Sequence, residues 1–341
     1  MGWRSFGIGL VVIFAAIFVF VNRSQVPAAW DASAKADPRF LMLAAVCAAI
    51  YLLNYGEMYR RALRSTGLHL PFWTAFRLAN AAHFLNMTIV NSGGMAGLAA
   101  FLPWVSATDR GDNRRGKAIS AYLLVALLGH FVFAFVLAGA LGLAASDGQV
   151  GRVEIVATGV FVLYTCFSAV LIVAAATSRA AVRWIHSRPG VALDYVRRRL
   201  HRPPPHRLGD MKAADELYDA LRLMIGNPLA MVPTAIHALL AEVAGVAILW
   251  SCLRAFGLNP GLEEPLVAYS MGVLFGIVGF LPAGLGFTEA GLAVALRPFG
   301  FTAVDIALVV ITYRLFEVWV PFLAGAISLR TAFHGSTVME Q

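Results

Sequence analysis

Long apolar runs, separated by short polar loops, make up most of the chain. A helix needs about 20 largely apolar residues to cross the hydrocarbon core of a bilayer. Segments of that length lie at 5–22, 40–58, 118–144, 154–178, 229–253 and 304–329. The pattern predicts an all-α polytopic membrane protein with about six transmembrane helices, of which the first is a retained helix rather than a cleaved secretory signal.

Two further apolar stretches are interrupted near their centres by residues that break helices. Stretch 71–104 contains the run from Asn91 to Gly94, and stretch 265–297 contains the run from Pro282 to Gly286. Gly and Pro interrupt helices, and each arm is too short for a comfortable crossing. We predict that both stretches are re-entrant helical hairpins, which enter and leave the membrane on the same side.

Basic residues indicate which loops face the cytoplasm, because short cytoplasmic loops of membrane proteins are rich in Lys and Arg. Clusters of basic residues lie at 60–64, 110–117 and 179–222. With all three inside, stretch 71–104 returns to the cytoplasmic side, and both termini are cytoplasmic. The third cluster contains an amphipathic stretch at 211–225, typical of an interfacial helix. The expected location is the bacterial inner membrane.

The predicted elements repeat in inverted orientation. Residues 40–144 form a helix, a hairpin and a helix that begin from the outer side, whereas residues 229–330 repeat this order from the cytoplasmic side. The remaining parts are the first helix and outer loop at 1–39, the fourth helix and basic cytoplasmic loop at 145–228, and a cytoplasmic tail at 331–341. Inverted repeats with broken helices are typical of secondary transporters, which bind substrate near the membrane midplane.

Composition agrees with a membrane protein: of the 341 residues, 59% are apolar and 13% charged, and the mean hydropathy is +0.73. The net charge of +8 falls in the loops, so we do not expect nucleic-acid binding. Cys47, Cys166 and Cys252 lie far apart in apolar runs, which predicts small buried residues rather than a disulfide framework or zinc site. The sequence has no Walker loop or zinc-ligand spacing, so we expect no metal, no cofactor and no ATP hydrolysis by this chain alone.

Ionisable residues at membrane depth are costly and seldom accidental. The candidates are Arg77, His130, His237, Glu242, Glu289, Arg314 and Glu317. Glu289 and Arg314 descend about 14 and 18 Å from a shared outer turn, which predicts an ion pair that Glu317 joins from one helical turn along. A structural salt bridge and a substrate or proton site are both open readings. The histidines are expected to be packing residues, and Glu242 and Arg77 have no partner that the sequence identifies.

The second arm of each hairpin is predicted to begin near mid-bilayer. Free amide groups and the helix dipole at such a start favour an anion, and a lipid phosphate is the commonest anion in a membrane. Close helix packing is the alternative reason for glycines there. The predicted substrate residues are Pro282, Gly284, Gly286, Thr288, Glu289 and Arg314 in the second hairpin region and Asn91, Gly93 and Gly94 in the first, with Glu317, Glu242, Arg77 and His130 as secondary candidates.

At these positions the sequence resembles a known family, the transmembrane region of lysylphosphatidylglycerol synthases and their stand-alone, flippase-like relatives. The resemblance covers about 5–330 and is carried by Asn91 to Gly94, by Leu281 to Glu289, and by Tyr313-Arg314 with Pro321 and Gly325 further on. Asn91 stands where many relatives have proline. The synthases carry an additional soluble aminoacyl-transferase domain, which we do not expect here. The resemblance implies the lipid-translocating half without the lipid-modifying half.

Three functions are compatible with these features. The first is a lipid transporter or flippase for a lipid with a polar, anionic headgroup, whose partners are membrane lipids. The second is a membrane-embedded enzyme or enzyme subunit that acts on lipid-linked substrates, with Glu289 or Glu242 as a base. The third is a membrane scaffold that recruits a soluble lipid-modifying enzyme through the loop at 179–222.

Overall fold

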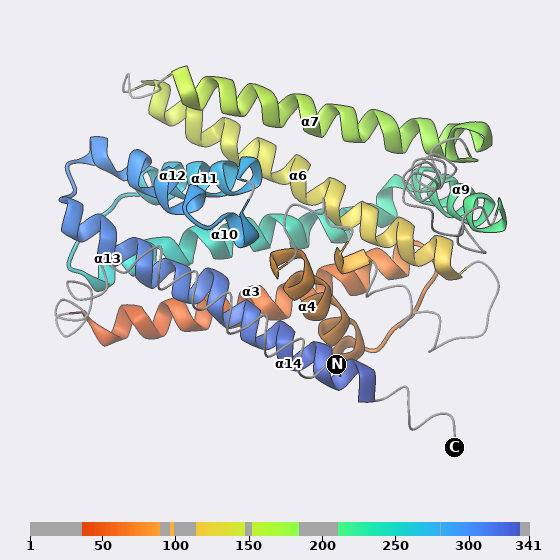
Figure 1. Cartoon of the computed structure of the whole chain (residues 1–341), viewed down its shortest axis with the longest axis horizontal. Helices are drawn as coiled ribbons and strands as arrows, with labels where there is room; N and C mark the ends of the chain where they lie inside the picture. The colour runs from red at the N-terminus through yellow and green to blue at the C-terminus, as the bar shows by residue number, and fades with distance from the viewer. Residues whose placement is uncertain are drawn as a thin grey trace, which may run out of the picture.

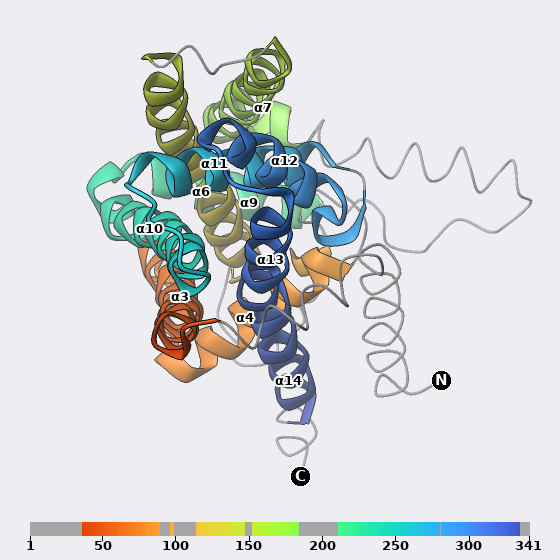
Figure 2. The same cartoon turned by 90° about the vertical axis from the view of Figure 1, so that its left-hand side faces the viewer.

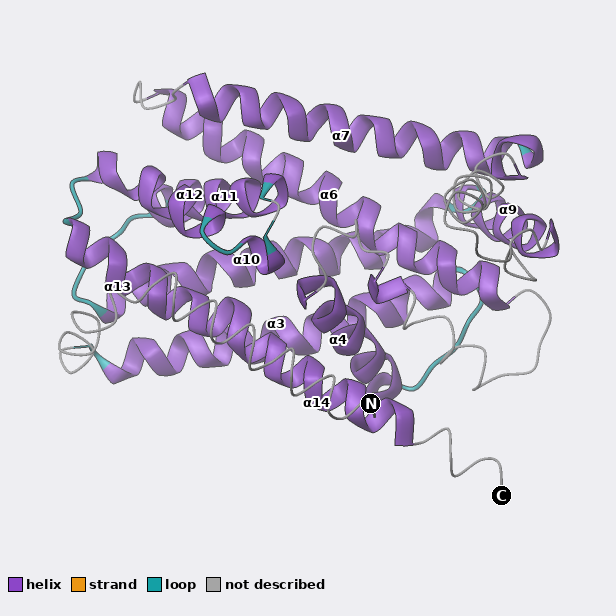
Figure 3. Ribbon diagram, viewed as in Figure 1, coloured by secondary structure: helices purple, strands orange, loops and turns teal. Residues whose placement is uncertain are grey.

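The structure is a computed structural model that describes residues 36–88, 96–98, 114–146, 152–183, 211–279 and 281–334. Within these ranges the regular structure is helical, and they contain no strand (Figure 1, Figure 3). The predicted all-α fold is therefore confirmed. The predicted first helix at 5–22 and the first break from Asn91 to Gly94 lie outside the described residues.

The described chain consists of long apolar helices and shorter helical segments between them. In chain order these are α3 (Pro38–Ser65), α4 (Phe72–Thr88), α6 (Arg114–Ser146), α7 (Arg152–Thr177), α9 (Met211–Ile225), the 3₁₀ turn η1 (Pro228–Met231), α10 (Val232–Ala255), α11 (Glu263–Val278), the 3₁₀ turn η2 (Pro282–Gly284), α12 (Phe287–Leu296), the 3₁₀ turn η3 (Arg297–Phe299), α13 (Ala303–Arg314), the π-helical turn η4 (Leu315–Trp319) and α14 (Val320–His334).

Several of these helices are long and apolar enough to cross a membrane. Among the described residues they are Pro38–Ser65, Gly116–Ala145, Pro228–Ala255 and Ala303–Arg330, and α7 contains a shorter apolar stretch at Phe161–Thr177. A helix of 28 residues is about 42 Å long at 1.5 Å per residue, which exceeds the hydrocarbon core of about 30 Å. The chain is a multi-pass integral membrane protein.

Polar residues determine where two of the long helices begin. The Asp37 side chain precedes α3 and accepts a hydrogen bond from the Arg39 amide at 2.9 Å, and Pro38 suits the first helical position because it needs no amide acceptor there. Thr302 and Asp305 form a capping box at the start of α13. Both starts lie at the left-hand end of the bundle in Figure 1, so α3 and α13 run in the same direction.

The long helices lie side by side along the longest axis of the molecule (Figure 1), and Figure 2 shows the bundle from its left-hand end. α3 packs along α10. The Asp37 amide at the start of α3 donates to the Ala255 carbonyl at the end of α10 at 2.8 Å, so the two helices run in opposite directions. Large apolar side chains such as Phe135 and Leu163 are exposed on the outer surface. Such a surface suits lipid as the surrounding solvent.

The amphipathic stretch predicted at 211–225 forms α9, which packs against α6 and α7 at the right-hand end of Figure 1. Its Leu221 side chain is buried in the bundle. On its polar face, Asp215 pairs with Arg183 at 2.9 Å, and this guanidinium holds the pKa of the Asp215 carboxyl below its usual range. Because the pair is exposed, it orients α9 and contributes little to stability.

The three cysteines do not share one environment. Cys252 is buried and Cys47 is half-buried, whereas Cys166 is exposed on α7. The prediction that all three are buried is therefore wrong for Cys166. The reason is the position of α7 at the edge of the bundle (Figure 1), where much of its apolar surface is exposed.

α4 and α14 pack closely because α14 has a glycine where the two helices meet. A Cβ atom added at Gly325 would lie 2.5 Å from the carbonyl oxygen of Asn80 and 2.6 Å from the Cβ of Phe84, both on α4. The Phe84 ring also packs against Phe322 of α14, with 4.8 Å between the ring centroids. Small residues permit such close approach of membrane helices, so residue 325 cannot carry a side chain without moving one helix.

We expect Gly325→Ala to lower the free energy of unfolding by about 1–3 kcal/mol, because the atoms that its methyl group would meet include the backbone of α4. Thermal unfolding of the purified protein in detergent measures this loss. Gly142→Ala on α6 is the matched control, since a Cβ atom at Gly142 meets nothing within 4 Å in the part of the chain that the structure describes. Equal stability of the two variants would show that α4 and α14 are not in close contact.

Candidate functional site

The predicted break of the second apolar stretch separates α11 from α12. The two helices pack against each other, and the chain reverses between them through three residues with positive φ: Ala283 at 51°, Gly284 at 63° and Gly286 at 80°. Such values are easy for glycine and costly for alanine. The reversal places the start of α12 beside the end of α11, away from both ends of the bundle (Figure 1).

Small residues bring the two arms together at this reversal. A Cβ atom added at Gly284 would lie 2.7 Å from both the Cα of Gly276 and the Oγ1 of Thr288. One turn earlier on α11, a Cβ atom at Gly272 would lie 2.9 Å from the Leu292 side chain. For Gly284 the structure therefore supports the packing explanation. Gly286 differs, because a Cβ atom there would meet none of the described residues within 4 Å.

Arg314, at the end of α13, is the charged centre of this region. Its Nε donates to Glu289 Oε1 at 2.8 Å, its Nη1 donates to Glu317 Oε2 at 2.7 Å, and its Nη2 donates to the Ala283 carbonyl at 2.8 Å. The predicted contacts of Arg314 with Glu289 and Glu317 are confirmed. The Ala283 carbonyl joins the cluster directly from the reversal.

The charges of this cluster are unequal in number and in burial. The side chain of Arg314 is 1% exposed, that of Glu289 is 13% exposed and that of Glu317 is 32% exposed. A guanidinium removed from water needs such partners, because an unpaired charge in a low-dielectric interior costs several kcal/mol. With both carboxylates ionised the cluster carries a formal charge of −1.

The helix beyond Arg314 is wound differently from those around it. The turn Leu315–Trp319 is π-helical, and it contains Glu317. π-helical turns inside α-helices are uncommon and are often found at functional sites. Here the wider turn follows directly after the residue that pairs with the hairpin.

The start of α12 has an acidic cap. The Gly286 amide donates to Glu289 Oε2 at 2.6 Å, while the other oxygen of the same carboxylate accepts from Arg314. The prediction of free amide groups at this helix start is therefore wrong for Gly286, because a carboxylate three residues along folds back onto it. Thr288 is buried beside Gly276 and Gly284.

The secondary candidates lie on other contacts. Glu242 on α10 accepts a hydrogen bond from the Tyr269 hydroxyl of α11 at 2.8 Å. Arg77 Nε donates to the Trp73 carbonyl at 3.2 Å. In the part of the chain that the structure describes, neither Glu242 nor Arg77 has an ion-pair partner, so these two residues are not part of the Arg314 cluster.

The two histidines make local contacts, as expected of packing residues. His130 Nδ1 lies 2.5 Å from the Ala126 carbonyl oxygen, and its ring stacks on Phe161 with 5.9 Å between centroids. His237 Nδ1 lies 2.7 Å from Asn54 Oδ1, which joins α10 to α3. Both rings therefore have partners within the bundle.

Two participants in the site could not be read from the sequence. The Ala283 carbonyl and the Gly286 amide are backbone groups, and their directions depend on the positive φ angles at the reversal. The run from Pro282 to Gly286 signals a break, which is the only sequence feature that points to exposed backbone polar groups. Tyr269, the partner of Glu242, carries no such signal.

Comparison with known families identifies what the chain is similar to. A family model described as the lysylphosphatidylglycerol synthase TM region matches residues 6–325. The matched residues include the reversal between α11 and α12 and the whole Arg314 cluster. A comparison with curated proteins gives no match.

Proposed function

Because this chain belongs to the family of lysylphosphatidylglycerol synthase transmembrane regions, whose members are linked to lipid metabolism or transport, we propose that it moves a lipid with an anionic headgroup across the bacterial inner membrane. The proposed topology has six spanning helices and two re-entrant hairpins in an inverted repeat, with both termini in the cytoplasm. Lipid enters between the two halves, and its acyl chains stay in the bilayer.

The lengths of the hairpin arms support this topology. α11 has 16 residues and α12 has 10, which correspond to about 24 and 15 Å at 1.5 Å per residue. Both are shorter than a hydrocarbon core of about 30 Å, and they run in opposite directions. A helix that ends inside the bilayer leaves backbone groups to satisfy, and such ends line binding sites in transporters.

The single observation that carries the proposal is the double role of the Glu289 carboxylate. One of its oxygens accepts from Arg314 Nε and the other accepts from the Gly286 amide. A phosphate presents two oxygens in a similar arrangement, and it binds the same kinds of donor, a guanidinium and the amide of a helix start. Glu289 thus occupies the donors that a lipid phosphate would use.

An anionic headgroup replaces Glu289 in the proposed mechanism. Arg314 stays in place meanwhile, because Glu317 and the Ala283 carbonyl hold its Nη1 and Nη2 groups. The headgroup phosphate competes with the Glu289 carboxylate for both donors, and return of the carboxylate to these donors releases the lipid. The open space beside Gly286 gives the headgroup its approach to the backbone.

Gly286→Leu is expected to abolish lipid movement while the protein stays folded, because the side chain fills the approach to the two donors. The assay uses vesicles of phosphatidylcholine with a trace of phosphatidylglycerol labelled on its acyl chain. Dithionite added outside quenches only outer-leaflet label. Vesicles with the wild-type protein should lose most of the fluorescence, and vesicles with Gly286→Leu should lose about the outer half alone.

Gly300→Leu is the matched control for strain. Gly300 shares φ 80° with Gly286, and its Cβ would likewise meet none of the described residues within 4 Å, but it belongs to the turn between α12 and α13. This variant should retain lipid movement. Folded wild-type protein that moves no phosphatidylglycerol would overturn the proposed function, and full movement by Gly286→Leu would overturn the proposed route.

A further inference from the structure

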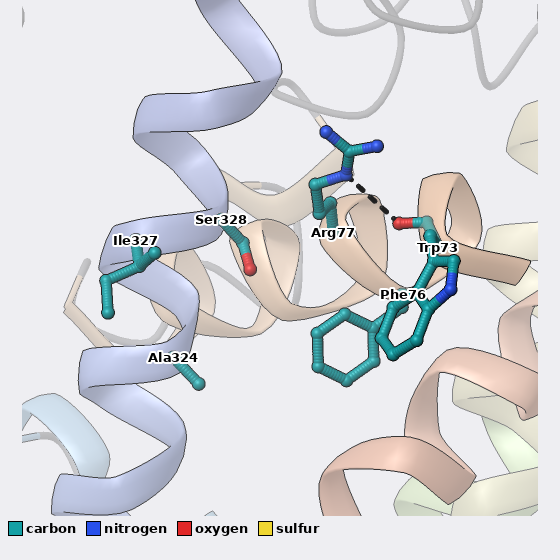
Figure 4. A pocket seen from close by; sticks show the side chains of 6 residues that line it. All are labelled: Trp73, Phe76, Arg77, Ala324, Ile327 and Ser328. Atoms are coloured by element: carbon teal, nitrogen blue, oxygen red, sulfur yellow. Dashed lines mark hydrogen bonds between the residues drawn. The ribbon is translucent and has the colours of Figure 1, made fainter.

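A pocket of about 400 Å³ opens on the outer surface where α4 meets α14. Figure 4 shows its lining, in which Ala324 of α14 lies on the side toward the rings of α4 and Ile327 points to the other side of that helix. The lining residues are Trp73, Phe76, Arg77, Ala324, Ile327 and Ser328. Four of these six side chains are aromatic or aliphatic, so the pocket is an apolar groove with a cation at one side.

The guanidinium of Arg77 is available to a ligand. Arg77 is exposed, and its Nε donates to the Trp73 carbonyl at 3.2 Å, which leaves its Nη groups directed away from the rings (Figure 4). No carboxylate among the described residues lies within ion-pair distance of it, in contrast to Arg60, Arg183 and Arg314. A membrane-facing arginine without a carboxylate partner favours an external anion.

The pocket lies close to two helix ends. Arg77 is five residues past the start of α4 at Phe72, or about 8 Å along the helix, and Ser328 is six residues before the end of α14 at His334, or about 9 Å. Both helix ends lie on the side of the bundle where α3 ends with Arg60, Arg61 and Arg64 (Figure 1), the side that the charge pattern assigns to the cytoplasm.

The chemistry of the lining selects one kind of occupant. Trp73 and Ile327 are 62% and 65% exposed and offer an apolar surface for an acyl chain. An indole near a helix end is typical of the membrane interface, and Arg77 supplies a charge-assisted hydrogen bond for a phosphate. We propose that this pocket binds an anionic phospholipid of the cytoplasmic leaflet, with its phosphate on Arg77 and an acyl chain along Trp73.

This site is separate from the Arg314 cluster, and it does not depend on the proposed transport. Close packing at Gly325, one residue from Ala324, holds the two walls together. Lipid bound here fills the groove between α4 and α14 from the outside. It therefore acts as a fixed, structural lipid rather than as the transported one.

Quenching of Trp73 fluorescence tests the site. The protein contains seven tryptophans, so the Trp73 contribution is the difference between the wild type and Trp73→Phe in mixed micelles. Phosphatidylglycerol with brominated acyl chains should quench this contribution at about one tenth of the concentration needed for brominated phosphatidylcholine, because both lipids offer a phosphate to Arg77 but only phosphatidylcholine also carries a cation that Arg77 repels. In Arg77→Ala the two lipids should quench at equal concentrations. Arg77→Lys should retain most of the preference for phosphatidylglycerol.

Arg39→Ala is the control for net charge, because it removes an exposed arginine from the opposite end of the bundle and should leave the preference intact. Excess glycerol 3-phosphate should not relieve the quenching, since it lacks the acyl chain. An unchanged preference in Arg77→Ala, an equal loss in Arg39→Ala, or relief by glycerol 3-phosphate would each overturn the proposal. Because quenching requires no lipid movement, these outcomes are independent of the transport assay.

Discussion

Arg314→Ala is expected to lower the free energy of unfolding by about 3–5 kcal/mol, the cost of breaking a buried ion pair by removing one partner. Arg314 is 1% exposed and donates to two carboxylates and one carbonyl. Its removal leaves Glu289 and Glu317 close together without a counter-charge and leaves the Ala283 carbonyl without this donor. Thermal unfolding in detergent should show the loss directly.

Arg183→Ala is the comparison for an ion pair outside the bundle. Arg183 donates to one carboxylate through two nitrogens, but Arg183 itself is exposed, in contrast to Arg314, so its loss should leave the unfolding temperature unchanged. Glu289→Gln should cost less than Arg314→Ala, since the amide oxygen can still accept one of the two hydrogen bonds. If Arg314→Ala unfolds at the same temperature as Arg183→Ala, the cluster is not buried in the folded protein.

The contact of Glu289 with Arg314 could be predicted because it depends on helix geometry alone. The two residues lie on helices that leave a common turn near Thr302, at similar distances from it, and both side chains are costly to leave unpaired in a membrane. The apolar runs likewise predicted α3, α6, α10 and the stretch Ala303–Arg330, since length and composition suffice for a spanning helix. Neither inference requires knowledge of side-chain packing.

The backbone part of the site could not be predicted, because it depends on tertiary structure. Nothing in the sequence indicates that Ala283, as well as the neighbouring Gly284, adopts a positive φ, here 51°, or that its carbonyl accepts from Arg314. The pocket beside Arg77 could not be predicted either. Its sequence position suggests an isolated cation, but the groove beside it exists only because Gly325 lets α14 approach α4.

The glycines of the reversal were predicted as one group, although the structure assigns them different roles. Gly284 combines φ 63° with a Cβ position 2.7 Å from the Cα of Gly276, so it is needed for packing. Gly286 has φ 80° and open space around it. Loss of transport in a Gly284 variant would therefore follow from damage to the hairpin. Of these two glycines, only a Gly286 variant tests the approach of a headgroup.

Gly284→Ala is accordingly expected to destabilise the protein by about 2–5 kcal/mol, the sum of about 1–2 kcal/mol for a left-handed backbone and about 1–3 kcal/mol for overpacking against α11. Gly286→Ala should lose only the stability that the left-handed backbone costs, about 1–2 kcal/mol. Thermal unfolding of the two variants in the same detergent measures the difference. If they lose equal stability, α11 and α12 do not meet at Gly276, and close packing no longer explains Gly284.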